Sequence, residues 1–266
     1  RTKDKKVAKQ LKPYVESQLI LELTGLKKTT PSLAFPVLSD KFLKRNNKRA
    51  KSTQKLYEYV LNSYISGKPL PTNPNSRAIF VRTINACWNW GLKNGLIDKA
   101  NKLNGDTKGE PRQRVYTKDE LVLLFNGIQD KNFNAFVKFA YYTGARSGEI
   151  RNIQLQNLTE GSLAVFGKTG RRMVKISRQA HTIIENQDPL WSYSKDFVSH
   201  TFKKEVRRLE IKDARFHDLR RTFGLNLIKQ GMSIYKVSKL LGHASVRTTE
   251  QHYAPLLTVE IEDFVL

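Results

Sequence analysis

Before residue 105, apolar positions recur at the spacing of amphipathic helices, and they predict three of them. Prolines between residues 69 and 74 break the chain between the second and the third. Asn75 or Ser76 is expected to cap the start of the third helix, and Gly95 to end it. The predicted helices span residues 32–46, 51–65 and 75–95, with apolar stripes at Val37, Leu38, Phe42 and Leu43, at Leu56, Tyr59, Val60 and Tyr64, and at Ile79, Phe80, Ile84, Cys87, Trp88 and Leu92.

The second half of the chain mixes helical spacing with one stretch of strand spacing. Thr117 and Glu120 form the pattern of a capping box, which predicts a helix over residues 116–128. A largely buried helix is expected to end at Gly144, and the next to begin near Arg146. Residues 162–177 alternate with a period of two, which predicts a β-hairpin with KTGRR at or beside its turn. Further helices are predicted over residues 193–209, 217–229, 234–241 and 246–256, so the fold class is mainly α with a small antiparallel β-sheet.

A polar segment separates the two halves. Residues 99–114 are rich in Gly, Asn, Asp, Pro and Lys, and they lack apolar periodicity apart from Leu103. We interpret residues 106–115 as a linker between a helical domain over residues 1–105 and a domain over residues 116–266 that includes the C-terminal tail. The basic residues of the linker either follow a phosphate backbone or form a solvated spacer, and both interpretations stay open.

The balance of charge indicates a polyanionic partner. Lys and Arg total 47 against 24 acidic residues, which gives a net charge of +23 over 266 residues. Residues 1–111 carry a net charge of +14 and residues 112–266 one of +9, so the first half is the more basic per residue. Nucleic acid is the commonest partner of a protein with such a strong positive charge, although ribosomal and membrane-surface proteins are also this basic.

Composition also bears on the compartment. Cys87 is the single cysteine, so the chain can form neither an intramolecular disulfide nor a Cys-rich metal site, which fits a reducing interior. Its apolar runs are far shorter than the roughly 20 residues that a membrane span requires. No signal-peptide pattern opens the chain, and because it begins at Arg1 without Met we expect residues upstream to be missing.

Two motifs carry arginines suited to phosphate chemistry. Arg146 lies in TGARSGEI, and its guanidinium can bind two phosphate oxygens in a bidentate fork. The alternative is a surface arginine that pairs with Glu149. His217 and Arg220 lie in HDLRRTF three residues apart, so a helix projects both to the same side. That pair is common on its own and gains weight only from the motifs around it.

The motif LLGHASVRTTEQHYAPL, residues 240–256, adds a histidine and a tyrosine. Gly242 is expected to end a helix in the left-handed conformation and to hold His243 at a fixed turn. A histidine that caps the helix dipole is the alternative. Tyr253 can act as a nucleophile that becomes covalently attached, although tyrosines of amphipathic helices are usually core residues.

If a nucleophile attacks a phosphodiester, the alkoxide that leaves needs a proton from a general acid. Lys168 in FGKTGRR is the candidate for this acid. A lysine at a hairpin tip can protonate a leaving 5′ oxygen if neighbouring arginines and desolvation lower its pKa. An ordinary exposed lysine is the alternative. Arg171 and Arg172 suit the role less well because a guanidinium does not readily give up a proton.

In order, spacing and residue type, these motifs resemble the tyrosine recombinases, the phage-integrase family. The resemblance is specific over residues 116–256 and weak over residues 30–105, where CWNWGLKNGLI is similar to the last helix of the family's core-binding domain. It implies a helical core-binding domain and a mixed α/β catalytic domain that grip opposite faces of a DNA duplex. The implied roles are Tyr253 as the nucleophile that forms a 3′-phosphotyrosine, Arg146, Arg220 and His243 as stabilisers of the phosphorane, Lys168 as general acid, His217 as base or positioning group, and Glu149 as the residue that orients the arginine or histidine.

The resemblance further implies a setting. It implies no cofactor, neither ATP nor metal, because the energy of the broken bond stays in the phosphotyrosine. The partners implied are a specific double-stranded DNA site, a homotetramer on two sites formed from a monomer or weak oligomer, and accessory DNA-bending or directionality proteins. The expected location is the cytoplasm and nucleoid of a prokaryotic host, with integration or excision of a mobile element such as a phage as the task.

Rival functions stay open at this point. A type IB topoisomerase or a telomere resolvase would use the same chemistry. A non-catalytic DNA-binding protein on this fold is the rival from another class. Among recombinases, the sequence does not separate an integrase from a dimer-resolving enzyme or a transposon recombinase, although its short spacing leans towards an integrase.

Overall fold

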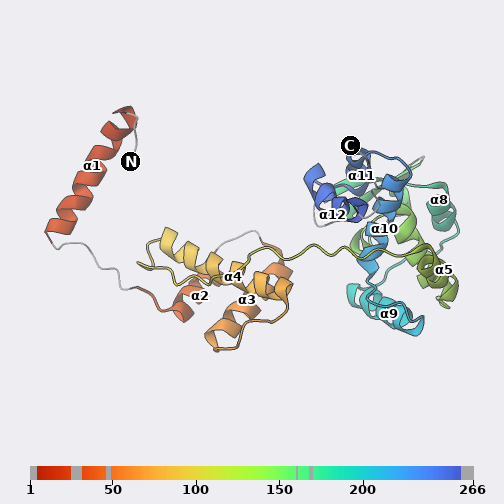
Figure 1. Cartoon of the computed structure of the whole chain (residues 1–266), viewed down its shortest axis with the longest axis horizontal. Coiled ribbons are helices and arrows are strands. Elements are labelled where there is room, and N and C mark those ends of the chain that lie inside the picture. The colour runs from red at the N-terminus through yellow and green to blue at the C-terminus, as the bar shows by residue number, and fades with distance from the viewer. Residues whose placement is uncertain (1–4, 25–31, 46–48, 160, 168–169, 259–266) are drawn as a thin grey trace, which may run out of the picture. The chain divides into compact units, whose positions relative to one another are not determined.

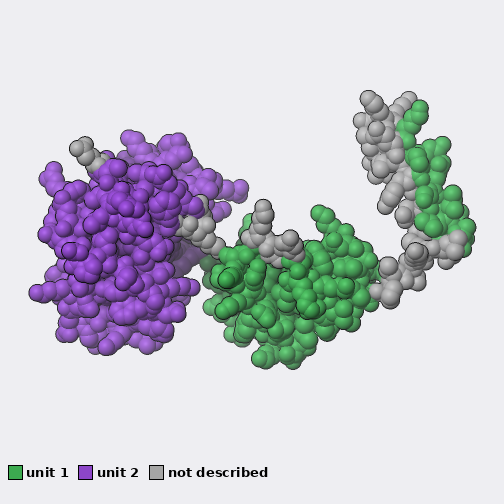
Figure 2. Space-filling view, turned by 180° about the vertical axis from the view of Figure 1, so that it is seen from behind, with its two compact units in different colours: residues 1–110 green, residues 111–266 purple. Residues whose placement is uncertain are grey.

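The computed structural model describes residues 5–24, 32–45, 49–159, 161–167 and 170–258 (Figure 1). The chain divides into two compact units, Arg1–Glu110 and Pro111–Leu266, coloured green and purple in Figure 2. The division between them falls inside the segment that we interpret as a linker. Lys168 and most of the C-terminal tail lie outside the described residues.

The first unit is helical. Its helices are α1 (Lys5–Leu23), α2 (Phe35–Lys44), α3 (Lys51–Ile65) and α4 (Pro74–Lys93). The three predicted helices correspond to α2, α3 and α4, which share a core that includes Leu38, Phe42, Leu61, Ile84 and Trp88. Helix α1 was not predicted, because its first residues look like a plain run of charge.

The start of α4 differs from the prediction. The cap is Asn73, whose side-chain oxygen accepts a hydrogen bond from the backbone N–H of Ser76 at 3.1 Å. Asn75 and Ser76 therefore lie inside the helix, and the prediction of either as the cap was wrong. Pro74 does not end the preceding segment; it occupies the first helical position, where its missing N–H costs nothing and its φ suits the helix.

The second unit contains the sheet and the remaining helices. The hairpin was predicted, whereas β1 and α8 were not. The elements are α5 (Lys118–Gly127), α6 (Lys131–Thr143), α7 (Ser147–Ile150), a 3-10 turn (Leu155–Asn157), β1 (Leu158–Thr159), β2 (Ser162–Gly167), β3 (Gly170–Lys175), α8 (Arg178–Glu185), α9 (Lys195–Arg208), α10 (Phe216–Lys229), α11 (Ile234–Leu241) and α12 (Val246–Thr258). The strands pair antiparallel in the order β1-β2-β3, and Val165 of β2 faces Arg172 of β3. The expected mainly α class with a small antiparallel sheet is confirmed.

Helix α6 forms the centre of the second unit. It packs against α8 and α10, and Phe133, Phe136 and Phe139 on it are fully buried. Helix α5 begins with the predicted capping box, in which Thr117 and Glu120 exchange hydrogen bonds of 2.9 and 3.1 Å. Helix α6 ends at Gly144 in the left-handed conformation, as predicted, and the chain passes directly to Arg146. Among the described helices, none combines the length and apolar character needed to cross a membrane.

Phe136→Ala is expected to destabilise the second unit by about 3–5 kcal/mol, because a large ring is removed from a site that cannot collapse. The Phe136 ring lies 5.4 Å from the ring of Phe216, the first residue of α10, and 5.6 Å from that of Trp191. Urea unfolding would measure the loss. Val122→Ala on the exposed face of α5 is the control, and we expect it to change the unfolding free energy by less than about 0.5 kcal/mol. Equal midpoints for the two variants would contradict this account of the core.

Candidate active site

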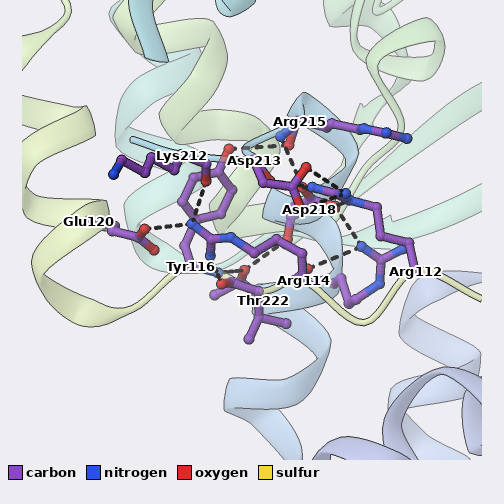
Figure 3. Close-up of polar contacts among 11 residues, drawn as sticks. Arg112, Arg114, Tyr116, Glu120, Lys212, Asp213, Arg215, Asp218 and Thr222 are labelled. Atoms are coloured by element: carbon purple, nitrogen blue, oxygen red, sulfur yellow. Dashed lines mark hydrogen bonds and ion pairs between the residues drawn. The ribbon is translucent and has the colours of Figure 1, made fainter. Parts of the chain in front are cut away.

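Ion pairs join the first residues of the second unit to α10, to the segment before it and to α5 (Figure 3). Arg112 donates to the carboxylates of Asp218 and Asp213 at 2.9 and 3.0 Å, and Arg114 donates to Glu120 at 2.5 Å. These two arginines of the predicted linker are therefore occupied inside the unit. Asp218 is buried and also accepts from Arg221 at 2.6 Å. The first turns of α10, which carry His217 and Arg220, are held in place by this network.

Arg220 is a buried cation whose hydrogen-bond partners are backbone carbonyls. Only 4% of its surface is exposed, and its guanidinium donates to the carbonyl of Gly144 at 2.5 Å and to that of Leu241. Burial, together with the charges of Arg146 and Arg172, lowers the pKa of Arg220 to about 9, so it remains charged at neutral pH. Within the described residues no carboxylate hydrogen-bonds to it. A buried charge of this kind favours an anion beside it.

Arg146 precedes α7 and pairs with Glu149, as the alternative to phosphate binding predicted. Its Nη1 lies 2.8 Å from Oε1 of Glu149, and its backbone N–H donates to Oε2 at 2.7 Å. Burial alone would raise the pKa of Glu149, but hydrogen bonds from Arg172 and from the Arg146 backbone lower it to about 2. Because 34% of the Arg146 side chain stays exposed, pairing does not prevent it from binding an anion.

The turn after α11 fixes His243. Gly242 has φ 62° and ψ 48°, the predicted left-handed cap, and the backbone N–H of His243 donates to Ser238. The Nδ1 of His243 lies 2.7 Å from the hydroxyl of Thr249, which leaves Nε2 for another partner. Burial, followed by the charges of Arg220 and Arg146, lowers the pKa of His243 to about 4. Burial, followed by the charges of Arg220, Arg221 and Arg146, lowers the pKa of His217 to about 4. Both imidazoles are therefore neutral at pH 7.

Tyr253 is a core residue, which is one of its two predicted interpretations, and its role as a nucleophile stays a prediction. It is 2% exposed and belongs to the core formed with Leu225, Val237 and Leu241. Its hydroxyl packs against Gly224 of α10: a methyl group there would overlap the oxygen and lie 2.6 Å from Cζ. Burial raises the pKa of Tyr253 to about 12, against the opposing charges of Arg220 and Arg221.

One small pocket brings the predicted groups together. His217, Arg220, Arg221, His243, His252 and Tyr253 line it. Its volume is about 40 Å³. Arg146 and Glu149 belong to the same electrostatic cluster, because Arg146 shifts the pKa of His217, Arg220 and His243 and Glu149 that of Arg220. Lys168 lies outside the described residues, so its role stays a prediction.

Sequence reasoning missed three members of the site. Arg172 binds Glu149, Arg221 lines the pocket, and His252 lines it with an Nδ1 that is buried without a hydrogen-bond partner among the described residues. For Arg172 the sequence held a signal: side chains alternate between the two faces of a strand, so Arg172 and Arg171 lie on opposite faces. For His252 the signal was adjacency to Tyr253. Among the described residues, no three or more His, Cys, Asp or Glu side chains gather as a metal site would need.

The arrangement suits a phosphodiester. Arginine and imidazole side chains line one pocket with Tyr253, and among the described residues the cluster of Arg146, Arg172 and Arg220 has one carboxylate, Glu149, in direct contact. Such groups can bind non-bridging oxygens and stabilise the charge that develops when phosphorus is attacked.

Comparison with known proteins decides the family. Residues 114–258, more than half of the chain, match the family model described as "Phage integrase family". The chain belongs to the phage integrase family. The predicted resemblance to tyrosine recombinases is thereby confirmed. Tyrosine recombinase XerC of Staphylococcus aureus (strain bovine RF122 / ET3-1) is 25% identical over 218 residues, which cover 71% of this chain and 73% of that relative.

Solved structures agree in fold. A lambda integrase dimer bound to a COC′ core site superposes with a TM-score of 0.72 at 17% identity, covering 94% of this chain and 87% of that one. The Tn1549 transposon integrase in complex with a circular intermediate DNA gives 0.65 at 13% identity, with coverage of 87% and 100%. These similarities support the fold of both halves of the chain.

Stability is expected to fall on acidification through this site. His217 and His243 have folded-state pKa values of about 4, below the ordinary 6.5, so unfolding takes up protons between these values. Stability is therefore fully present above pH 6.5 and is lost as the pH falls towards 4. Urea midpoints measured from about pH 7 to about pH 4.5 would show the slope. His217→Gln/His243→Gln should flatten it, while His200→Gln on α9 should not; an unchanged slope in the double variant would refute the assignment.

Gly224→Ala is expected to displace the Tyr253 side chain, because the added methyl group occupies the position of the hydroxyl. Nitration by tetranitromethane followed by peptide mass spectrometry would report the change: Tyr253 should be protected in the parent protein and should react in the variant. Gly148→Ala is the matched control, since its methyl group would meet only Arg151 at 3.6 Å. Equal protection in all three proteins would mean that α10 yields rather than the tyrosine.

Proposed function

We propose that this chain is a site-specific recombinase that cleaves and rejoins double-stranded DNA through a covalent 3′-phosphotyrosine at Tyr253. The observation that carries the proposal is the shared pocket, which Tyr253 lines together with Arg220, His217 and His243. Membership of the phage integrase family supports it. So does the net charge of +23, which suits a phosphate backbone.

In the proposed reaction, the Tyr253 oxygen attacks the scissile phosphorus and the 5′ oxygen leaves. Arg146 and Arg220 would bind the non-bridging oxygens, and His243 would donate to one of them from Nε2. His217, neutral at pH 7, can accept the phenolic proton or position the phosphate. Lys168 would protonate the departing 5′ oxygen. The 5′ hydroxyl of a second strand then reverses the steps, so neither ATP nor a metal is required.

The surroundings of the reaction are proposed from relatives. A lambda integrase tetramer has been seen on a Holliday junction, and Tn1549 integrase with a circular intermediate DNA. By analogy we propose a homotetramer on two DNA sites, formed from a monomer or weak oligomer, with residues 1–105 as a DNA-binding domain joined by the linker 106–115. The task would be integration or excision of a mobile element in a prokaryotic cytoplasm, with accessory DNA-bending or directionality proteins.

Tyr253→Phe is expected to abolish the covalent adduct while leaving DNA binding within about twofold, because only the nucleophilic oxygen is removed. A binding site selected from a random duplex library would be built into a nicked suicide duplex, and adducts would be counted on denaturing gels. The yield should fall at least about a thousandfold. Tyr235→Phe, on an exposed tyrosine of α11, is the matched control and should react normally.

The rival functions give different outcomes in the same experiment. Tight binding to the selected site without an adduct would favour a non-catalytic DNA-binding protein. An adduct followed only by relaxation of a supercoiled plasmid would favour a type IB topoisomerase, and hairpin ends a telomere resolvase. Exchange of strands between two duplexes is the outcome that the proposal requires.

A further inference from the structure

We infer that Arg172 is a positioning residue for this reaction: its guanidinium sets Glu149, and through it Arg146, and fixes the turn that precedes His243. The inference rests on the proposed function and adds a residue to it. Arg172 stands on β3, in the strand that follows the hairpin tip.

The strand places Arg172 where an apolar side chain would be ordinary. Along β3, Arg171 and Met173 are exposed, whereas Val174 and the following Ile176 are buried. Arg172 pairs with the buried Val165 across the hairpin, and 12% of its side chain is exposed. An arginine held this deeply destabilises the fold unless each of its donors has a partner.

All three guanidinium nitrogens of Arg172 have a hydrogen-bond partner. Its Nε donates to Oε1 of Glu149 at 2.9 Å and its Nη2 to Oε2 at 2.8 Å, which is a bidentate fork. Its Nη1 donates to the carbonyl of Leu240 at 3.0 Å. With two further donors from Arg146, the four acceptor sites of the Glu149 carboxylate are filled. The carboxylate can therefore take one orientation, and that orientation decides where Arg146 Nη1 lies.

The charge of Arg172 matters as much as its geometry. If Glu149 were balanced by Arg146 alone, the pair would be neutral and Arg146 would attract a phosphate weakly. With Arg172 the trio carries one net positive charge. The exposed share of the side chain is 34% for Arg146 but 12% for Arg172, so Arg146 is the member that can reach an anion. Arg172 acts through it rather than on the substrate.

The third donor of Arg172 extends its influence to His243. The carbonyls of Leu240 and Leu241 are held by Arg172 and Arg220 respectively, and His243 follows two residues later. Gly242 packs on the same arginine, since a methyl group there would lie 2.5 Å from Cδ of Arg172. The Arg172 side chain thus links Arg146, which precedes α7, with the turn that follows α11.

The test compares Arg172→Gln and Arg172→Lys with Arg171→Gln, the exposed neighbour on the other side of β3. Single-turnover cleavage of the nicked suicide duplex should slow by about 10²-fold in Arg172→Gln, because misplacement of a catalytic group by about 1 Å has this effect. Arg172→Lys should lose less, and Arg171→Gln should match the parent rate. DNA affinity should change by less than about threefold in all of them.

A methylphosphonate at the scissile position separates positioning from general damage. It lacks the charge on the non-bridging oxygens, so a defect that acts through Arg146 should shrink to less than about tenfold. In an Arg146→Ala background, Arg172→Gln should slow cleavage by less than about threefold further, because the two residues act as a unit. An equal defect on both substrates that adds to that of Arg146→Ala would overturn the inference, and so would a parent rate in Arg172→Gln.

Failure of the proposed function would look different, since the unaltered protein would give no adduct on any selected site. The inference is then decided without cleavage, by calorimetric binding of inorganic phosphate. Arg172→Gln and Arg146→Ala should each weaken phosphate binding by the same factor, and the double variant should bind phosphate no more weakly than either single variant. Independent effects of the two substitutions would overturn the inference. Circular dichroism checks folding, and Arg172→Lys, which keeps the cation, serves if Arg172→Gln unfolds.

Discussion

The structure of the second unit depends on arginines that have hydrogen-bond partners inside the protein while part of their charge stays unbalanced. Arg220 is held by the carbonyls of Gly144 and Leu241, from the ends of α6 and α11. Arg146 and Arg172 share a single carboxylate, Glu149. Carbonyl partners satisfy a guanidinium's donors but leave its charge, so a positive potential is retained where water has been excluded. The same contacts that join three helices thereby leave a positive charge that favours an anion.

Helix α10 connects this site with the start of the unit. His217 and Arg220 face the pocket, while Asp218 on another side of the helix receives Arg112 and Arg221. The backbone N–H of Tyr116 donates to Thr222 of the same helix at 2.8 Å. The basic residues of the linker were predicted either to follow phosphates or to be solvated; in the structure Arg112 pairs with Asp218 of α10 and Arg114 with Glu120 of α5.

Sequence periodicity predicted the elements that bury one clear face, namely α2, α3, α4, the hairpin and α9 to α12. It missed β1, which has two residues, α8, and α1, whose apolar positions are interspersed with lysines. It misplaced the cap of α4 because Pro74 looks like a break and is a first helical residue. In the site, residue type and spacing found His217, Arg220, His243 and Tyr253. Arg172 and Arg221 escaped because their significance lies in partners distant in sequence, Glu149 and Arg114, which only the fold brings near.

Tyr253 is buried in the core, and its predicted role as a nucleophile has to be compatible with that burial. A core residue and a nucleophile impose opposite demands, since packing buries the hydroxyl and raises its pKa while attack needs an ionised oxygen. Gly224 reconciles the geometry, because only a residue without a side chain leaves room for the phenol beside α10. Arg220 and Arg221 oppose the effect of burial on the pKa. The packing that fixes the tyrosine therefore raises its pKa, and the charges of Arg220 and Arg221 are the contribution that favours the phenolate which the proposed attack needs.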